Sequence, residues 1–315
     1  MSLELIIDVH YHLIPVLPDG MVEGIAKDPI RAAKIIGKKV DPEDIRARVQ
    51  NFCVDRRGRK VLKRMDEGGV DFTIIVGVDD SRDEEITPEL VQLQNKMIAD
   101  AANKNSDRLM ALAGIDPRRP EALDMLKECI EDFGMKGLKY HTDYGYDPSG
   151  PESYELLEYL EKKNGILLSH TGPMYPPSRN SFAHPMRLSD IGVDFPKLKV
   201  IAAHMGLINW RPWASLASFQ PNLYGDLAMW SPYAIGNPEL FCRELRTIID
   251  YAGVEKILYA SDGPIFDMVV PAKEFIEFLK GLPEKAPNGI KFTKEEINAI
   301  LGENAAKLLG LNFEK

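Results

Sequence analysis

The fold is decided by the stretch Leu3-Glu4-Leu5-Ile6-Ile7-Asp8-Val9-His10-Tyr11-His12, in which an apolar run leads directly into two alternating histidines. The run predicts a buried strand. Alternate side chains of a strand share a face, so the Cα atoms of His10 and His12 lie about 6–7 Å apart and both imidazoles can bind one ion. A barrel enzyme places its chemistry at this end of a strand. The pair alone fits two surface histidines equally well, so its partners decide the interpretation.

Seven further short apolar runs follow, each bounded by Gly, Pro, Asp or Asn and separated by stretches compatible with helices. This alternation predicts βα units. A doubly wound open sheet is the alternative to a barrel, but no Gly-x-Gly-x-x-Gly turn follows the first strand. Eight repeats favour a distorted (β/α)₈ TIM barrel. The predicted strands are 4–10, 71–78, 109–115, 137–141, 165–170, 199–204, 222–228 and 256–261, and helices are expected at 88–104, 120–133, 151–163 and 238–251.

Two stretches depart from this repeat. Residues 13–55 are too long for an ordinary βα loop, so they predict an insertion with helices at 29–36 and 42–49 that serves as a lid over the strand ends. Near the end of the chain, Thr293 and Glu296 have the spacing of a capping box that opens a C-terminal helix over 293–310. We expect that helix to close the barrel rather than to do chemistry. The whole chain, 1–315, is therefore predicted to be one domain.

The composition limits the partners. Hydrophobic residues make up 44% and charged residues 28% of the chain, as in globular proteins that bury a sizeable core. The net charge is −9 and no basic cluster with interleaved aromatics stands out, so a nucleic acid partner is not expected. The sequence shows no leader and no apolar run of about 18 residues, so no membrane partner is expected either. We expect a cytoplasmic protein with three reduced thiols, Cys53, Cys129 and Cys242.

Five of the six histidines lie at ends of predicted strands. Each one alone can be an ordinary hydrogen-bonded residue, and the Asp-Gly-Pro after the eighth strand can be a plain turn. In a closed barrel, however, these side chains converge on one rim from strands that are distant in sequence. Together they favour a metal site over a set of unrelated structural residues. The residues are His10, His12, His141, His170, His204 and, after the eighth strand, Asp262.

Neutral imidazoles and one carboxylate suit zinc, manganese or iron, and three or four such ligands leave a position open for water or substrate. A bound divalent ion lowers the pKa of its water toward about 7 and polarises a carbonyl group. A neighbouring carboxylate or imidazole then moves the proton. We predict that Asp262 and His204 are the catalytic residues with this role.

Five motifs in order along nearly the whole chain resemble the amidohydrolase superfamily. Within it, they resemble the amidohydrolase-related (amidohydrolase 2) group, which includes aminocarboxymuconate-semialdehyde decarboxylase and related aromatic-acid decarboxylases. The motifs are Asp8-Val9-His10-Tyr11-His12 with Ile14-Pro15, Leu168-Ser169-His170-Thr171-Gly172, Phe195-Pro196-Lys197-Leu198-Lys199-Val200 leading to Ala203-His204-Met205-Gly206, Tyr259-Ala260-Ser261-Asp262, and Ile300-Leu301-Gly302-Glu303-Asn304 with the residues through Leu309.

This resemblance implies a distorted (β/α)₈ barrel that holds one divalent metal, most often zinc, with manganese or iron as alternatives. It implies the ligands His10, His12, His170 and Asp262, with His204 as the catalytic histidine. It also suggests a homodimer.

In relatives with two metals a carboxylated lysine ends the fourth strand, and Lys139 lies near that position. The match to the group with one metal is closer, so Lys139 is expected to bind a substrate carboxylate or to pair with an acid. His141 is expected to face the pocket without binding the metal. We interpret His184 as a turn residue and expect Asp226 and Trp230 to line the pocket. Packing in the core or at the rim is an equal alternative for Trp230.

Four functions remain open for a small-molecule substrate. The first is hydrolysis, in which metal-activated water attacks an amide, ester or lactone carbonyl of a carboxylate-bearing compound. The main alternative is non-oxidative decarboxylation of an aromatic or unsaturated acid, which Ile14-Pro15 favours. Hydration of an unsaturated acid and a scaffold protein without activity are weaker hypotheses. Loop side chains set specificity, and those able to contact a carboxylate or a ring are Arg56, Arg57, Arg59, Lys139, Tyr144, Tyr175, Arg179 and Arg211.

Overall fold

The computed structural model describes residues 5–312, and the chain divides into two compact units. One unit combines residues 5–73 with 227–312, and the other is 74–226. All eight predicted strands are present and form one sheet in the order β1 to β8. Their bounds are β1 Ile7–His12, β2 Phe72–Val76, β3 Leu109–Gly114, β4 Gly137–Tyr140, β5 Ile166–His170, β6 Lys199–Ala203, β7 Leu223–Asp226 and β8 Ile257–Leu258.

The sheet closes on itself. The N–H of Val9 on β1 donates to the carbonyl of Tyr259 just after β8 at 3.1 Å, and Tyr11 pairs in parallel with Gly263. Parallel strands joined in sequence order and covered by helices make a (β/α)₈ barrel, so the predicted fold is confirmed. The eighth strand is only two residues long, shorter than the predicted 256–261.

The first strand differs from its prediction in a way that matters for the site. It runs two residues further than expected and ends at His12, and every one of its residues is buried. The relative exposure of His10 is 0% and that of His12 is 7%, so the alternative of two surface histidines is wrong. Glu4, where the strand was predicted to begin, lies outside the described residues. A strand of a parallel barrel buries both faces, which is why polar and apolar positions of β1 are enclosed alike.

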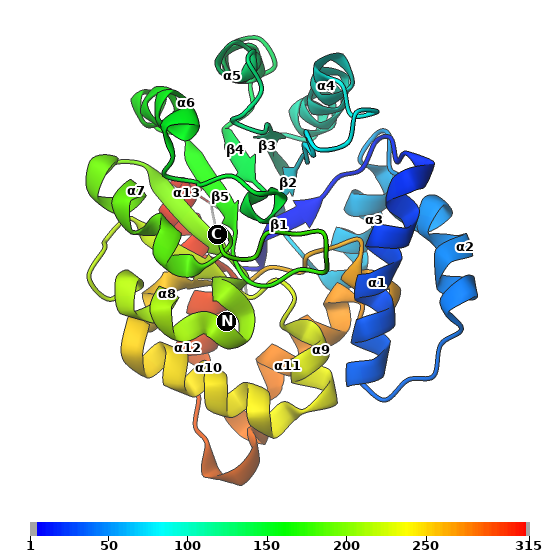
Figure 1. The fold of residues 1–315 in the computed structure, drawn as a ribbon. Helices are drawn as coiled ribbons and strands as arrows, with labels where there is room; N and C mark the ends of the chain where they lie inside the picture. Colours follow the sequence, from blue (N-terminus) through cyan, green and yellow to red (C-terminus); the bar gives the residue numbers. More distant parts are fainter. Residues whose placement is uncertain (1–4, 313–315) are drawn as a thin grey trace. The chain divides into compact units, whose positions relative to one another are not determined.

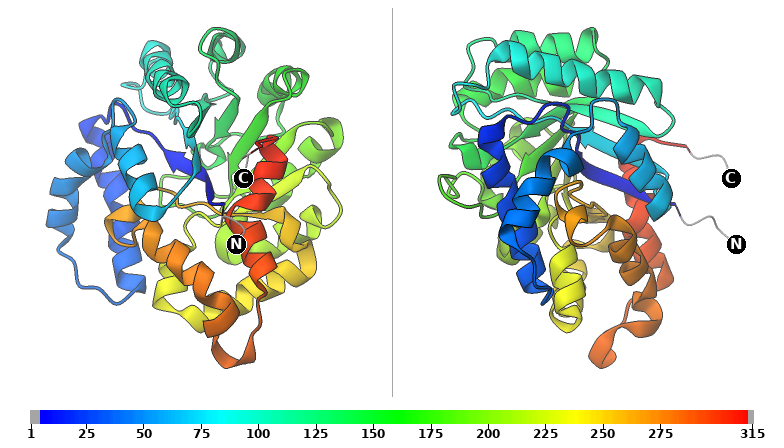
Figure 2. Two further views of the ribbon diagram at one scale, coloured as in Figure 1. Left: turned by 180° about the vertical axis from the view of Figure 1, so that it is seen from behind. Right: turned by 90° about the vertical axis from the view of Figure 1, so that its right-hand side faces the viewer.

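The predicted insertion, 13–55, forms two helices, α1 Asp19–Ile35 and α2 Pro42–Cys53, and α3 Arg59–Gly68 follows it before β2. Helices α1 and α2 lie side by side in Figures 1 and 2 around a small core of their own. The prediction for α1 was wrong at its start, because Pro29 was interpreted as an N-terminal residue and instead lies inside the helix. The start of α2 is as predicted, with Asp41 accepting a hydrogen bond from the backbone of Glu43 at 3.0 Å. The role of 13–55 as a lid, and the single domain, stay predictions.

The C-terminal helix is present, and its capping box is confirmed by both hydrogen bonds between Thr293 and Glu296. The helix is not continuous, because a π-helical turn interrupts it at Ala299–Glu303. The carbonyl of Ile300 in that turn accepts the N–H of Tyr259 at 2.9 Å, so the interrupted helix is tied to the end of β8. The helices of this unit beyond α3 are α9 Ser231–Gly236, α10 Pro238–Ala252, α11 Ala272–Lys285, α12 Lys294–Asn298 and α13 Asn304–Leu309, with 3₁₀ turns at Val254–Lys256, Phe266–Met268 and Pro287–Gly289.

In the second unit, α4, α5 and α6 lie on the outer side of β3, β4 and β5 (Figure 1). Helix α4 begins and ends as predicted, with Thr87 as its N-cap and proline in its first turn. The helices here are α4 Pro88–Lys104, α5 Ala122–Glu131, α6 Pro151–Lys162, α7 Ser189–Asp194 and α8 Trp210–Ala217, with 3₁₀ turns at Thr142–Tyr144, Pro185–Leu188 and His204–Asn209. Within residues 5–312, no helix combines the length and the apolar character needed to cross a bilayer.

Candidate metal centre

His10, His12 and Asp262 form a compact group in the first unit. The Nε2 atoms of the two histidines are 3.1 Å apart, and Oδ1 of Asp262 lies 3.6 Å from His10 Nε2 and 3.3 Å from His12 Nε2. All three side chains are buried, and their donor atoms lie within 4.8 Å of one another. Two imidazole nitrogens and a carboxylate oxygen that face one point are a donor set suited to a divalent ion. The group therefore fits the predicted metal site.

The seam of the barrel brings this group together. The N–H of Asp262 donates to the carbonyl of His10 at 3.0 Å, and the N–H of His12 donates to the carbonyl of Gly263 at 2.7 Å. Asp262 has a positive φ of 56°, a left-handed conformation that non-glycine residues rarely adopt. Such strain is retained where the surrounding structure dictates it, and it is common at functional sites.

Asp8 accepts hydrogen bonds from the segments that carry this group. Its carboxylate accepts the N–H of His10 at 3.1 Å and both the N–H and the hydroxyl of Ser261, at 3.0 and 2.5 Å. Burial raises the pKa of Asp8 to about 7, although the hydrogen bonds from Ser261 and His10 oppose the shift. The side chain thus fixes the backbone of His10 and of Ser261, which directly precedes Asp262. Asp8 is part of the first sequence motif, but the motif does not predict this bridging role.

In the second unit, His170 at the end of β5 lies beside His204, which follows β6. His170 Nδ1 and His204 Nε2 are 3.1 Å apart, and His170 Nε2 lies 3.2 Å from the carbonyl oxygen of Gly172. A carbonyl only accepts, so His170 carries its proton on Nε2 and presents the lone pair of Nδ1. A carbonyl that fixes the tautomer in this way is typical of metal-binding histidines. The backbone N–H of His204 donates to the buried carboxylate of Asp226 at 2.7 Å.

His141 belongs to the same unit and has a carboxylate partner that was not predicted. Its Nδ1 is 3.3 Å from Oδ1 of Asp143, and its ring stacks on that of His170 with centroids 5.4 Å apart. Burial opposes ionisation of Asp143, whereas the hydrogen bonds that it accepts from His141 and Ser178 favour ionisation, and the net effect lowers the pKa of this carboxyl. His141, Asp143 and His170 are a second group with donor atoms within 4.8 Å.

The remaining predicted residues have diverse positions. Lys139 is buried on β4, in register with Leu168 of β5, and its assignment to a substrate or a second metal stays a prediction. His184 caps the turn at Pro185–Leu188 by accepting the N–H of Met186 at 3.2 Å, so its interpretation as a turn residue is confirmed. Trp230 packs edge-on against Phe241, which supports the packing alternative.

Comparisons with known proteins agree with this fold. Residues 7–311 match the family model described as Amidohydrolase. The sequence is 23% identical over 273 residues to gamma-resorcylate decarboxylase of Rhizobium sp. (strain MTP-10005), which covers 71% of this chain and 81% of that protein.

Two crystal structures of similar fold belong to proteins with related names. One is 5-carboxyvanillate decarboxylase LigW from Sphingomonas paucimobilis, with a TM-score of 0.65, 18% identity, and coverage of 98% of this chain and 100% of that one. The other is a dihydroxybenzoic acid decarboxylase from Polaromonas sp. JS666 with bound manganese and the inhibitor 2-nitroresorcinol. It has a TM-score of 0.63, 18% identity, and coverage of 99% of this chain and 98% of that one.

Proposed function

The chain belongs to the amidohydrolase family of enzymes, and on that premise we propose that it is a metal-dependent, non-oxidative decarboxylase of aromatic or unsaturated carboxylic acids. The observation that carries the proposal is the similarity, over 71% of the chain, to a protein named gamma-resorcylate decarboxylase. The sequence alone placed hydrolysis first and decarboxylation second. The named relatives support the reverse order.

We assign the metal ligands to His10, His12, His170 and Asp262. Three of these already form a group with interatomic distances that suit one ion, and His170 presents a lone pair on Nδ1. In a (β/α)₈ barrel the carboxyl ends of all strands share one rim, and the four residues stand at the ends of β1, β5 and β8. Zinc or manganese fits this mixture of imidazole and carboxylate. When bound, the ion would anchor the oxygen atoms of the acid and withdraw electron density from them.

His204 is the residue that we assign to proton transfer. Without a metal, His170 Nδ1 accepts and the proton in the 3.1 Å contact between the two rings belongs to Nε2 of His204. If a bound ion took the lone pair of Nδ1, this proton of His204 would be released to face the substrate. In the proposed reaction this proton is added to the carbon that bears the carboxylate. The bond between that carbon and the carboxylate then breaks, its electron pair stays with the ring or alkene, and carbon dioxide leaves. Asp262 is the alternative proton carrier, because its carboxylate faces the same pair of β1 histidines.

The experiment that tests this proposal offers 2,6-dihydroxybenzoate, 5-carboxyvanillate and a panel of lactones and esters to the zinc- and manganese-loaded protein. We expect carbon dioxide and the decarboxylated ring in equal amounts from at least one acid, and no turnover by His204→Ala. His184→Ala is the matched control, because it removes a histidine that only caps a turn. Hydrolysis of a lactone or ester with no carbon dioxide from any acid would refute the decarboxylase and restore the hydrolase.

A further inference from the structure

We infer that Arg64 is a positioning residue that holds the His10, His12 and Asp262 group in its metal-binding geometry from the outer side of β1. The inference rests on the proposed function only in that this group binds a metal. Arg64 lies on α3, and none of the hydrogen bonds described below goes to a histidine. It acts through Tyr11 and Asp267, two residues that are adjacent in space to Gly263, the neighbour of Asp262.

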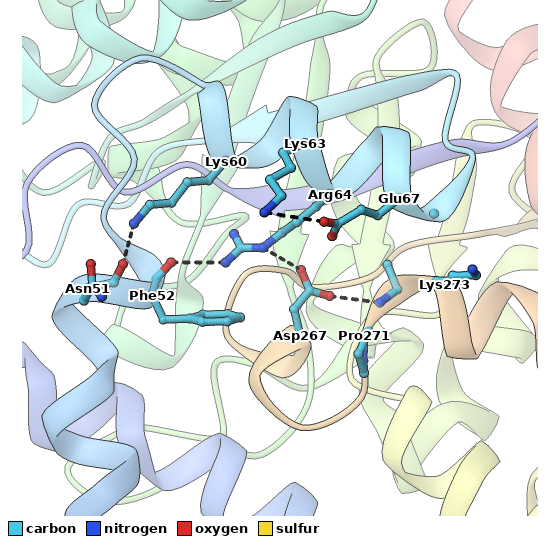
Figure 3. A pocket seen from close by; sticks show the side chains of 11 residues that line it. Asn51, Phe52, Lys60, Lys63, Arg64, Glu67, Asp267, Pro271 and Lys273 are labelled. Atoms are coloured by element: carbon cyan, nitrogen blue, oxygen red, sulfur yellow. Dashed lines mark hydrogen bonds and ion pairs between the residues drawn. The ribbon is translucent and has the colours of Figure 1, made fainter.

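The guanidinium of Arg64 joins three segments of the chain, as Figure 3 shows in part. It donates to the hydroxyl of Tyr11 on β1 and to the carbonyl of Phe52 on α2, the latter at 3.1 Å. Its Nε lies 3.6 Å from Oδ2 of Asp267, in the segment between β8 and α11. The group also stacks on the ring of Phe52, 4.4 Å from its centroid. A planar guanidinium with five donors can hold several partners at once, which an ammonium group cannot do in the same way.

Tyr11 carries the effect of Arg64 toward the metal group. It stands between His10 and His12, so its side chain points to the opposite face of β1. Its ring covers Gly263 so closely that a Cβ atom there would lie 2.5 Å from Tyr11 Cε2. The position of this ring therefore sets how closely the residues after β8 approach β1. Because Asp262 directly precedes Gly263, the same spacing sets the distance from its carboxylate to the two imidazoles.

Asp267 provides the second connection. Its Oδ1 accepts the N–H of Ala272 at the start of α11, at 3.1 Å. Its Oδ2 would be 2.8 Å from a Cβ on Gly263, and among residues 5–312 this buried oxygen accepts no hydrogen bond. The positive charge of Arg64 is the nearest compensation for it. Removing Arg64 would leave a buried carboxylate without its ion-pair partner, and such a group moves toward water or other donors.

Arg64 is also within reach of small solutes. It lines a cavity of about 680 Å³ together with Phe52 and Asp267, and the side chains of Lys60, Lys63 and Lys273 lie around them (Figure 3). This volume is far larger than a guanidinium ion needs. The cavity therefore allows a test in which the lost group is supplied from solution.

The test measures cobalt(II) affinity from the visible absorption of the protein, which needs no substrate. We expect Arg64→Ala to weaken cobalt binding about tenfold, the lower end of the range for residues that orient metal ligands. Tyr11→Phe should weaken it by a smaller factor, because it removes one of the two connections. The double variant should be no weaker than Arg64→Ala alone, because Arg64→Ala already removes the connection through Tyr11. Millimolar methylguanidinium should restore the affinity of Arg64→Ala and leave the wild type unchanged.

Lys63→Ala is the matched control. It removes a positive charge from the same helix and the same cavity, but its side chain is 77% exposed and pairs with the exposed Glu67. We expect wild-type cobalt affinity. If Arg64→Ala does not fold, the cobalt affinities of Tyr11→Phe and Arg64→Lys test the inference in its place, and both should be weaker than that of the wild type.

Cobalt affinity in Arg64→Ala and Tyr11→Phe equal to that of the wild type would overturn the inference, even if their thermal stability falls. A wild-type protein that binds no cobalt would instead overturn the metal centre of the proposed function.

Discussion

Replacing Asp267 with asparagine should make the stability of the protein less sensitive to pH. Burial raises the pKa of Asp267 from its ordinary value of 3.8 to about 6, and Arg64 only partly opposes this. A carboxyl with a raised pKa in the folded state stabilises the fold below the unfolded value, and the contribution is lost as the pH rises through the folded value. The contribution of Asp267 to the free energy of unfolding is therefore lost between about pH 4 and about pH 6. The pKa shift of a little over two units, at 1.36 kcal/mol per unit, makes this loss about 3 kcal/mol.

Asparagine is neutral at every pH and can still accept the N–H of Ala272 through its amide oxygen, so it imitates protonated Asp267. At pH 4 the two proteins should differ little in free energy of unfolding. At pH 7 the variant should be more stable relative to the wild type by about 3 kcal/mol, because it avoids the buried charge.

The assay is urea unfolding of both proteins without added metal, at intervals from pH 4 to pH 7.5, with the difference in unfolding free energy plotted against pH. Glu67→Gln is the control, because it removes a carboxylate from the same cavity that is well exposed. A difference between wild type and Asp267→Asn that is flat across this range, or that favours the wild type as the pH rises, would refute the reasoning.

Three further predictions test other parts of the molecule. His10→Ala should abolish stoichiometric zinc binding in a metal titration, whereas His184→Ala should bind as the wild type does. Gly263→Ala should cost about 1–3 kcal/mol in a denaturant titration, since its methyl group would meet a buried aromatic ring at 2.5 Å. Asp79→Ala should cost about 3–5 kcal/mol because it leaves a buried arginine unpaired, whereas Asp80→Ala, which breaks a more exposed ion pair, should cost at most about 1 kcal/mol in the same assay.

The alternation of strands and helices was predictable because it depends on local patterns. Helix α4 illustrates this, since Thr87 and Pro88 mark its start and the apolar period does the rest. Helix α1 shows where such patterns mislead. Pro29 would normally open or interrupt a helix, but the turn before it is held by packing against α2, which no window of sequence reveals.

The site was likewise predictable in part from the sequence. His10, His12 and Asp262 were found because strand ends can be located from sequence and a barrel gathers them. The partners that hold them were missed for a physical reason. Arg64 is 53 residues from Tyr11 in the chain and on a different kind of element, so only the folded structure shows their hydrogen bond. Long-range contacts of this kind produce no periodic pattern in the sequence.

The alternation of side chains along β1 explains why the proposed metal ligands and the residue that supports them are neighbours in the sequence. Because successive side chains of a strand point to opposite faces, a His-x-His motif necessarily carries a residue on its reverse side. That residue is Tyr11, and the closure of the barrel places it against Gly263. A smaller side chain there would leave a cavity at the seam, and a side chain without a hydroxyl would leave Arg64 with one partner fewer. The chemistry of the face of β1 that carries the two histidines therefore constrains the residue on its other side, and the seam of the barrel is part of the proposed metal centre.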